Sequence, residues 1–308
     1  MPFNILHVGK FYPPHAGGME THLHDLVTGL VDRYSVHVLV ANDGIHRQNE
    51  RSGGARITRV AKFGTVASMP VTPALPWEIS RQRTDLVHVH TPHPSAAFAV
   101  YVAQYRGPLI VTHHSDILGR DYLRLCVQPF IRHLMSRADR IIVTSQRYLE
   151  SSKELDEYRQ KCVVIPLAIG EAALAPCKSE EVAELRKVLG ENLIIAVGRL
   201  VHYKGFEYAI RAMTRVSGML AIVGTGPLET QLRNLVAELK LTKKVCFLGK
   251  VRDVRPYYAA AKVFVLPSVS RAEAFGLVQL EAMAAALPVV NTDIDSGVPE
   301  VSVMAELG

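Results

Sequence analysis

The sequence is poor in the features that mark secreted and membrane-spanning proteins. Only four of its 308 residues are cysteines, and Cys126, Cys162, Cys177 and Cys246 are widely spaced. This spacing excludes a disulfide framework and a zinc knuckle, and it fits a reducing cytoplasm. No run reaches the roughly 18 uninterrupted apolar residues that a membrane-spanning helix needs, and the start lacks the basic and apolar regions of a signal peptide. We therefore expect a cytoplasmic protein without a membrane span.

The overall composition is that of a globular protein. Hydrophobic residues make up 48% and charged residues 21% of the chain, which excludes disorder as its main state. At about 100–200 residues per domain, the length suggests two domains, each with a core of its own.

The positive charge is concentrated in the first half. Residues 1–165 contain 19 Lys and Arg against 14 Asp and Glu, while residues 166–308 contain 16 against 15. The first half also contains 12 of the 13 histidines. Such a field suits anionic partners, namely phosphates, acidic lipid headgroups or nucleic acid. Nucleic acid is the weakest of these, because the basic stretches lack interleaved aromatic residues and no known binding module is visible.

Short β-branched or leucine-rich runs alternate with segments of helical periodicity along the whole chain. The predicted strands are 4–8, 36–41, 86–90, 109–112, 140–144, 163–165, 193–197, 220–223, 245–248, 263–266 and 288–291. This alternation predicts an α/β protein with parallel sheets and helices on both faces. A Pro, Gly and Ala-rich stretch near 166–177 separates the halves. We therefore predict domains at 1–168 and 169–308, with ligands binding beyond the carboxyl ends of the strands.

Glycines and cations follow several of these strands. Gly17 and Gly18 precede an apolar helical run, so their backbone N–H groups suit a phosphate. Taken alone, the glycine pair is more typical of a flexible strand-to-helix turn. After the first strand of the second half come Arg199, a planar fork for phosphate oxygens, and Lys204, a mobile point charge at a helix start. Both could instead be solvated surface charges. Further tight turns contain Gly198, Gly224 and Gly226.

The most specific string is residues 273–284, which follows another predicted strand. If Gly276 begins the helix, Glu273 lies in the loop before it and Glu281 lies within it. Two carboxylates in these positions suit a hydroxyl-rich ligand, because each accepts hydroxyl hydrogen bonds. The alternative is a helix with a stabilising acid at its N-terminus and one exposed glutamate.

Taken in order, these strings resemble those of the retaining glycosyltransferases of family 4, over nearly the whole chain. The resemblance rests on Gly17-Gly18-Met19-Glu20, Gly198-Arg199-Leu200 with Lys204-Gly205, Gly224-Thr225-Gly226-Pro227, residues 273–281 and Gly297-Val298-Pro299-Glu300. Residues 275–284, 290–293 and 296–302 are similar to those of the mannosyl- and rhamnosyltransferases of surface-polysaccharide assembly.

The resemblance implies the GT-B fold, in which two Rossmann-like parallel-sheet domains face each other across a cleft. It implies transfer of a hexose from a GDP- or UDP-sugar, with retention of configuration, to a glycan or lipid-linked acceptor of cell-surface polysaccharide or glycolipid synthesis. The family generally needs no metal or other cofactor, and the sequence has no paired aspartates and no His/Cys cluster of metal-ligand spacing. The residues do not specify the donor base, the sugar or the acceptor.

The resemblance also implies roles for individual residues. Those implied to be catalytic are His114, Arg199, Lys204 and Glu273, and those implied to bind the donor are Gly17, Gly18, Gly198, Gly224, Gly226, Phe275, Gly276 and Glu281. Gly17 and Gly18 would meet the diphosphate, which Arg199 and Lys204 would neutralise. His114 has His113 beside it, and a buried structural histidine is the competing interpretation.

In this fold the acceptor binds mainly to the first domain, where the excess of basic residues lies. Residues 120–147 combine six arginines with an apolar stripe of helical spacing, and a second basic stretch contains Arg47, Arg51, Arg56, Arg59 and Lys62. A basic amphipathic helix can lie on an anionic membrane, whereas the same stripe can simply pack against the sheet. We therefore expect peripheral contact with the inner membrane face.

The sequence departs from the family pattern in two ways. Family members usually continue well past the Gly-x-Pro-Glu turn, so we expect an incomplete second domain, and a non-catalytic relative that binds nucleotide or a partner subunit is the alternative function. Ala286 stands where relatives often have glycine at a helix end. If that position is left-handed, alanine costs roughly 1 kcal/mol there.

Overall fold

The computed structural model describes residues 2–15, 17–66, 69–117 and 121–306. The chain divides into two compact units, Met1–Leu167 and Ala168–Gly308, and each has its own sheet and core. The break lies one residue before the boundary that the composition suggests. No helix in the described part of the chain is both long and apolar enough to cross a membrane.

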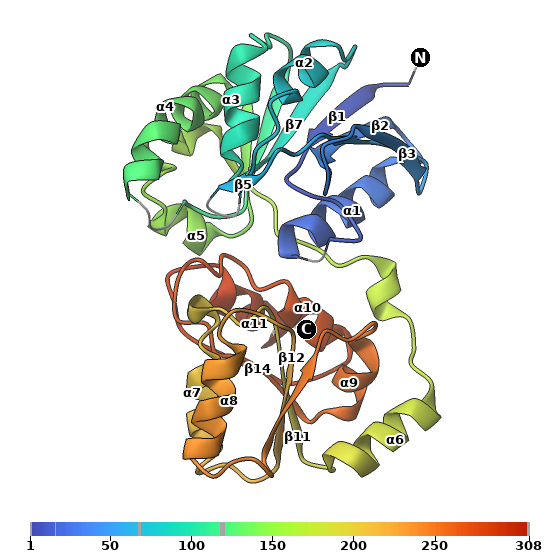
Figure 1. Ribbon diagram of the computed structural model, residues 1–308, viewed down its shortest axis with the longest axis vertical. Helices are drawn as coiled ribbons and strands as arrows, with labels where there is room; N and C mark the ends of the chain where they lie inside the picture. The colour runs from blue at the N-terminus through green and yellow to red at the C-terminus, as the bar shows by residue number, and fades with distance from the viewer. Residues whose placement is uncertain (1, 16, 67–68, 118–120, 307–308) are drawn as a thin grey trace. The chain divides into compact units, whose positions relative to one another are not determined.

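The first unit is built on an eight-stranded sheet in the order β10-β9-β8-β7-β1-β2-β4-β3 (Figure 1). Its strands are β1 (Asn4–Val8), β2 (Ser35–Ala41), β3 (Gln48–Ser52), β4 (Ala55–Val60), β7 (Leu86–Thr91), β8 (Leu109–His113), β9 (Arg140–Val143) and β10 (Cys162–Val164). All neighbours are parallel except β3 and β4, which form an antiparallel hairpin at one edge. The sequence pattern missed this hairpin because every residue of β3 is exposed and polar.

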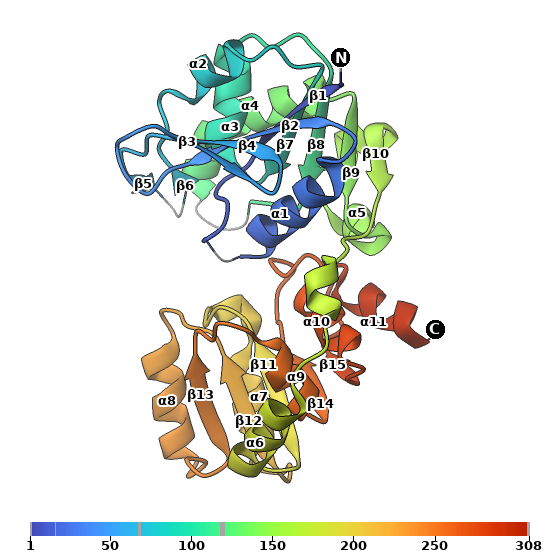
Figure 2. The same ribbon diagram turned by 90° about the vertical axis from the view of Figure 1, so that its right-hand side faces the viewer.

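Helices cover both faces of this sheet. They are α1 (Gly18–Leu30), α2 (Leu75–Ser80), α3 (Pro94–Val102), α4 (Asp121–Arg137) and α5 (Gln146–Ser151), with the 3₁₀ helix η1 (Asp156–Lys161) and the small hairpin β5 (Thr65–Val66) and β6 (Met69–Pro70). Leu23 and Val27 of α1 pack on buried residues of β2 and β4. Helices α2, α3 and α4 pack side by side on the other face (Figures 1 and 2).

Helix α4 contains part of the predicted basic amphipathic segment. Ile131 and Leu134 are buried, and Phe130 packs edge-on against aromatic rings of α3, so most of the described apolar stripe faces the protein. Leu125, which is not part of that stripe, is 69% exposed. Arg120 and the side chains of 121–124 lie outside the described residues.

The second unit is an all-parallel five-stranded sheet in the order β13-β12-β11-β14-β15. Its strands are β11 (Leu193–Val197), β12 (Met219–Val223), β13 (Val245–Gly249), β14 (Val263–Leu266) and β15 (Val289–Asn291). Because successive side chains of a strand point to opposite faces, each strand supplies two cores. Leu193 and Ile195 enter one core, and Ala196 enters the other.

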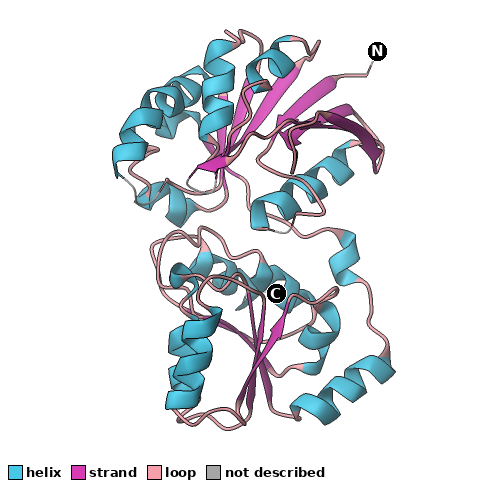
Figure 3. Cartoon of the chain, viewed as in Figure 1, coloured by secondary structure: helices cyan, strands magenta, loops and turns pink. Residues whose placement is uncertain are grey.

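The helices of this unit are arranged around those two cores. They are α6 (Ser179–Leu189), α7 (Phe206–Ala212), α8 (Glu229–Glu238), α9 (Arg255–Ala260), α10 (Val278–Ala284) and α11 (Val298–Glu306), with the 3₁₀ helices η2 (Glu171–Leu174) and η3 (His202–Lys204). Helices α7 and α8 cover one face, and α6 and α9 cover the other (Figures 1 and 3). All loops that follow a strand therefore meet at one edge of the sheet.

The end of α10 confirms the expectation for Ala286. Its φ is 56°, which is the left-handed region. The N–H groups of Ala286 and Leu287 donate to the carbonyls of Met283 and Ala282, so the helix closes with the paired bonds of a Schellman motif. Glycine is the usual residue in this position because it has no Cβ.

Candidate functional site

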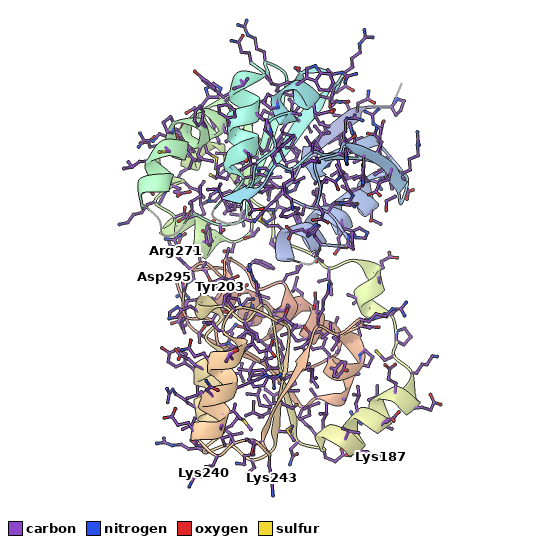
Figure 4. The ribbon with its side chains drawn as sticks, viewed as in Figure 1. Lys187, Tyr203, Lys240, Lys243, Arg271 and Asp295 are labelled. Carbon is purple, nitrogen blue, oxygen red and sulfur yellow. The ribbon has the colours of Figure 1, made fainter. Side chains whose placement is uncertain are left out.

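The loops at the carboxyl edge of the second sheet are bonded to one another. The N–H of Leu200 donates to the carbonyl of Thr225 at 3.0 Å, and that of Val269 donates to the carbonyl of Tyr203 at 2.9 Å. Figure 4 shows Tyr203, Arg271 and Asp295 together at this end of the unit, and Lys240 and Lys243 at the opposite end. The loops after β11, β12, β14 and β15 thus form one backbone-supported platform.

Two predicted glycines are needed because these loops approach closely. A Cβ on Gly224 would lie 2.0 Å from the carbonyl oxygen of Gly198, and one on Gly226 would lie 2.4 Å from that of Leu200. Gly224 also has a φ of 131°. Any side chain at these two positions would push the loops apart. Their glycines therefore shape the platform, whether or not they touch a ligand.

Lys204 and Glu273 form an ion pair at the centre of this platform. The Lys204 Nζ contacts Glu273 Oε2, and the two side chains are only 10% and 11% exposed. The hydroxyl of Ser268 donates to the same carboxylate oxygen at 3.3 Å. Lys204 closes η3 and precedes α7 by two residues, so it is a held, buried cation rather than the mobile surface charge that its place in a loop suggests. The ion pair between these two residues was not predicted from the sequence.

The stem of Lys204 occupies the space that Gly198 leaves open. A Cβ on Gly198, whose φ is 155°, would lie 3.2 Å from Lys204 Cε. The Lys204 ammonium also lies 6.0 Å from the centre of the Tyr203 ring. Gly198 therefore gives the lysine its path to Glu273.

Arg199 lies in the same electrostatic neighbourhood. Burial raises the pKa of the Tyr203 hydroxyl, and the charges of Lys204 and Arg199 oppose that rise while Glu273 adds to it. Arg199 itself is exposed, and within the described part of the chain no carboxylate pairs with it. One exposed guanidinium thus lies near a buried ion pair, and a guanidinium can donate two parallel hydrogen bonds to phosphate oxygens.

The string from Glu273 to Glu281 differs in detail from expectation. Gly276 does not begin the helix; it lies in the loop with a φ of 76°, and α10 begins two residues later. Phe275 is buried, so its ring faces the protein and its carbonyl accepts from Gln279 Nε2 at 3.1 Å. Glu281 lies within α10 as expected, and its Oε2 accepts from the Tyr258 hydroxyl at 3.1 Å.

In the first unit, Gly17 and Gly18 open helix α1. Both are exposed, and no side chain caps the first N–H groups of this 13-residue helix. A Cβ on Gly17 would lie 2.2 Å from Glu20 Oε2, whereas one on Gly18 would meet nothing within 4 Å. The helix start therefore has donors available for an anion.

The two adjacent histidines after β8 have different surroundings. His113 Nε2 lies 3.1 Å from Asp116 Oδ1, and its Nδ1 lies 3.1 Å from the Thr91 hydroxyl, so its ring is fixed on both sides. His114 is 7% exposed, and its Nε2 lies 3.3 Å from His90 Nδ1. Burial, with His22 and His113 nearby, holds the pKa of His114 well below its usual value.

His114 belongs to a cluster that the sequence spacing did not reveal. His7, His22, His88, His90 and His114 form a chain of ring contacts with centroid distances of 4.5–5.9 Å. The cluster arises because His7 lies opposite His88 in the β1–β7 register, and His88 and His90 share a strand face. Histidines at alternating positions of a predicted strand were the available signal.

The second predicted basic stretch is largely neutralised. Arg47 pairs with Glu78, Arg59 pairs with Glu50 at 2.7 Å, and Lys62 lies 3.5 Å from Asp43. Arg56 donates to Gln82 and contacts His37. These cations hold the β3–β4 edge of the sheet and present less free charge than the sequence suggests.

Comparison with known proteins decides which family this architecture represents. The pattern that defines Glycosyltransferase Family 4 matches residues 16–171, which is half of the chain. The pattern called Glycosyl transferases group 1 matches residues 178–308. The chain belongs to glycosyltransferase family 4. The second match lies within the second unit, and the first match covers most of the first unit and runs four residues past its end.

This family 4 glycosyltransferase has relatives that act on different sugars. It is 29% identical over 304 residues to the O-antigen chain mannosyltransferase C of Escherichia coli, covering 95% of this chain and 80% of that protein. It is also 29% identical over 226 residues to the D-rhamnosyltransferase WbpZ of Pseudomonas aeruginosa, covering 73% of this chain but 59% of that protein.

Solved structures confirm the GT-B fold of this family 4 glycosyltransferase. The Anabaena protein Alr3699/HepE in complex with UDP and glucose superposes with a TM-score of 0.76 at 21% identity, over 97% of this chain and 83% of that one. At this identity the likeness establishes the fold, with its two Rossmann-like parallel-sheet units, as the sequence predicts.

Proposed function

We propose that this glycosyltransferase moves a hexose from a GDP- or UDP-sugar, with retention of configuration, to a glycan or lipid-linked acceptor of cell-surface polysaccharide or glycolipid synthesis. The observation that carries the proposal is the buried Lys204–Glu273 pair beside the exposed Arg199. Relatives named mannosyltransferase and rhamnosyltransferase support the assignment to polysaccharide assembly.

The second unit would hold the donor. Arg199 offers a planar fork to the diphosphate, and Lys204 offers an ammonium that the pair with Glu273 keeps in position. When the sugar enters, Glu273 would accept its hydroxyl hydrogen bonds, and Glu281 would do the same for the ribose. Gly198, Gly224 and Gly226 would allow the ligand to approach the backbone as closely as the loops approach one another.

The first unit would serve the reacting centre. Gly17 and Gly18 would donate N–H groups from the start of α1 to the diphosphate, and His114 would lie near the reacting sugar. The lowered pKa of His114 keeps its imidazole neutral at pH 7, so it can donate or accept a hydrogen bond without a charge.

The chemical task is to stabilise the departing nucleotide diphosphate while the sugar carries partial positive charge. Fixed cations aimed at the leaving oxygens supply this stabilisation, and losing one such group costs roughly 3–4 kcal/mol of barrier. We propose that the reaction needs no metal or other cofactor. The acceptor attacks the face that the leaving group vacates, and a leaving phosphate oxygen takes the acceptor proton.

Donor binding and transfer can be tested together. Thermal melting of the full chain with UDP, GDP, ADP and their sugars identifies the donor, because a ligand at a hundred times its dissociation constant adds about 2.7 kcal/mol of stability. Transfer from that donor then separates an enzyme from a protein that only binds nucleotide. Arg199→Ala should lower transfer at least about a hundredfold. Arg215→Ala, an exposed arginine that precedes β12 at the opposite sheet edge, is the matched control. Equal rates for the two variants would contradict the role of Arg199.

We further propose peripheral contact between the first unit and the cytoplasmic face of an anionic membrane. Exposed aromatic and apolar side chains on adjacent helices support it, namely Trp77, Phe98, Tyr101 and Leu125, of which Trp77 stacks with the Arg81 guanidinium. Aromatic rings beside cations suit the headgroup region. Sedimentation with phosphatidylglycerol vesicles at low salt should exceed that with neutral vesicles, and equal binding to both would remove the proposal.

A further inference from the structure

The histidine cluster in the first unit contains more imidazoles than the proposed transfer uses. Four of its members, His7, His88, His90 and His114, are less than 9% exposed. The fifth, His22, projects from α1 and is half-buried, so it is the one member in partial contact with solvent. Burying five imidazoles together without an intervening carboxylate is unfavourable, because each ring has polar nitrogens that require hydrogen-bond partners.

The nitrogens of the cluster are arranged in short steps. His90 Nδ1 lies 3.3 Å from His114 Nε2, and His90 Nε2 lies 3.3 Å from His7 Nδ1. His88 Nε2 is already engaged with the Thr112 hydroxyl at 2.7 Å. The buried His7 Nε2 finds no hydrogen-bond partner among the residues that the structure describes. At least one ring nitrogen of the cluster is therefore buried without a partner among the described residues.

Two groups of three are compact enough to share one ion. In His22, His90 and His114 one ring nitrogen of each lies within 4.8 Å of the others, and the same holds for His7, His88 and His90. Around a tetrahedral zinc with Zn–N bonds of about 2.0–2.1 Å, the ligand nitrogens are about 3.4 Å apart. The His90–His114 separation of 3.3 Å already has this value.

We infer that His22, His90 and His114 form a binding site for a divalent transition ion of the zinc class. Access favours this trio over His7, His88 and His90, because His22 is half-buried whereas all three members of the other trio are enclosed. A ring adjustment of His22 alone would close the site on the fixed His90–His114 pair. Three histidines would leave a fourth position for water or another ligand, as in open zinc sites.

Two further properties agree with this site. Burial lowers the pKa of His22, His90 and His114, so their lone pairs remain available to a cation at neutral pH. Borderline imidazole ligands prefer zinc, cobalt, nickel and copper to magnesium or calcium. Occupation would engage His114 and so would inhibit transfer, but the site itself stands on its own residues and not on the proposed reaction.

The test uses untagged full chain that has been treated with EDTA, with cobalt chloride as the probe. We expect saturable one-to-one binding, seen as the visible absorption of four-coordinate cobalt, and displacement by zinc chloride. His22→Ala should weaken cobalt binding at least about tenfold. His24→Ala is the matched control because it lies two residues away on the same helix and pairs with Asp25. It should bind cobalt as the unmodified chain does.

A third variant distinguishes the two trios. His88→Gln should retain cobalt binding, because His88 belongs only to the enclosed trio. The inference fails if no absorption develops, if His22→Ala binds as tightly as His24→Ala, or if His88→Gln alone abolishes binding. None of these readouts requires sugar transfer, so their failure is distinguishable from a failure of the proposed function. Circular dichroism of each variant shows whether it has folded.

Discussion

Removing one member of the buried Lys204–Glu273 pair should destabilise the second unit more than removing one member of an exposed ion pair would. Both side chains are about nine-tenths buried, and among the described residues no second carboxylate pairs with the ammonium. Glu273→Ala would leave that ammonium without its carboxylate. Breaking a buried pair in this way costs about 3–5 kcal/mol. At roughly 3 °C per kcal/mol for a domain of this size, the melting temperature should fall by about 10 °C.

The double variant Lys204→Met with Glu273→Gln separates stability from catalysis. It removes both charges but keeps similar volumes, and such replacements of buried pairs are often close to neutral. We expect its melting temperature to lie within about 3 °C of the unmodified chain. Transfer should nevertheless fall at least about a hundredfold, because the cation proposed for the diphosphate is gone.

Scanning calorimetry and a transfer assay on the same preparations provide the measurement. Because the chain folds as two units, only the transition of the second unit should shift. A melting temperature unchanged by Glu273→Ala would show that the pair contributes as little as an exposed one. A double variant as unstable as the single variant would show that the charges themselves hold the loops together. Either result would refute the reasoning.

Three further predictions concern stability. Ala286→Gly should stabilise the second unit by about 1 kcal/mol because residue 286 has a left-handed backbone. Ala285→Gly, one residue earlier with a negative φ, should destabilise the unit. Urea denaturation that ranks the two variants otherwise would contradict the left-handed conformation at residue 286. Lowering the pH from 7 to 5.5 should destabilise the first unit. Burial lowers the pKa of His7 to about 3, so below pH 6.5 the unfolded chain binds a proton that the folded chain does not. The free energy of unfolding therefore falls between pH 6.5 and 3, by about 1 kcal/mol per such histidine at pH 5.5. Urea midpoints that do not change with pH would disprove this. Gly224→Ala should lower the free energy of unfolding by about 3 kcal/mol, because the new Cβ would lie 2.0 Å from a carbonyl oxygen. Gly190→Ala, at a residue with a φ of 89° and open space around it, should lower it by about 1 kcal/mol. Equal losses of stability in thermal melts would contradict the clash at Gly224.

Local patterns predicted much of the fold. The bounds of β1, β11 and β14 agree residue for residue with the predicted strands. Strand β11, for example, is a wholly apolar run between Asn192 and Gly198. Hairpin β3–β4 was missed because every residue of β3 is polar and exposed, so this strand has no apolar run to mark it.

The contacts within the candidate site could not be predicted from the sequence, and the roles of its residues stay predictions. Lys204 and Glu273 were each expected near a diphosphate sugar, but their mutual ion pair depends on how the loops after β11 and β14 pack. The histidine cluster depends on strand register, which places His7 opposite His88 and is invisible to spacing along the chain. Ala286, in contrast, could be anticipated, because the conformation of a helix end depends on neighbouring residues in the sequence.

Strand β3 forms a polar, exposed edge of the eight-stranded sheet. It is the last strand at one side of the eight-stranded sheet, and all of its residues, Gln48–Ser52, are exposed. An open strand offers unpaired amide and carbonyl groups to any neighbouring molecule. Alternating charges such as Glu50 and Arg51 make that border a poor template, because a second copy would have to desolvate them. Replacing Glu50 and Arg51 with valine and threonine should make this edge strand prone to pair with β-strands of other molecules, and so to aggregate at the concentrations used for crystallisation.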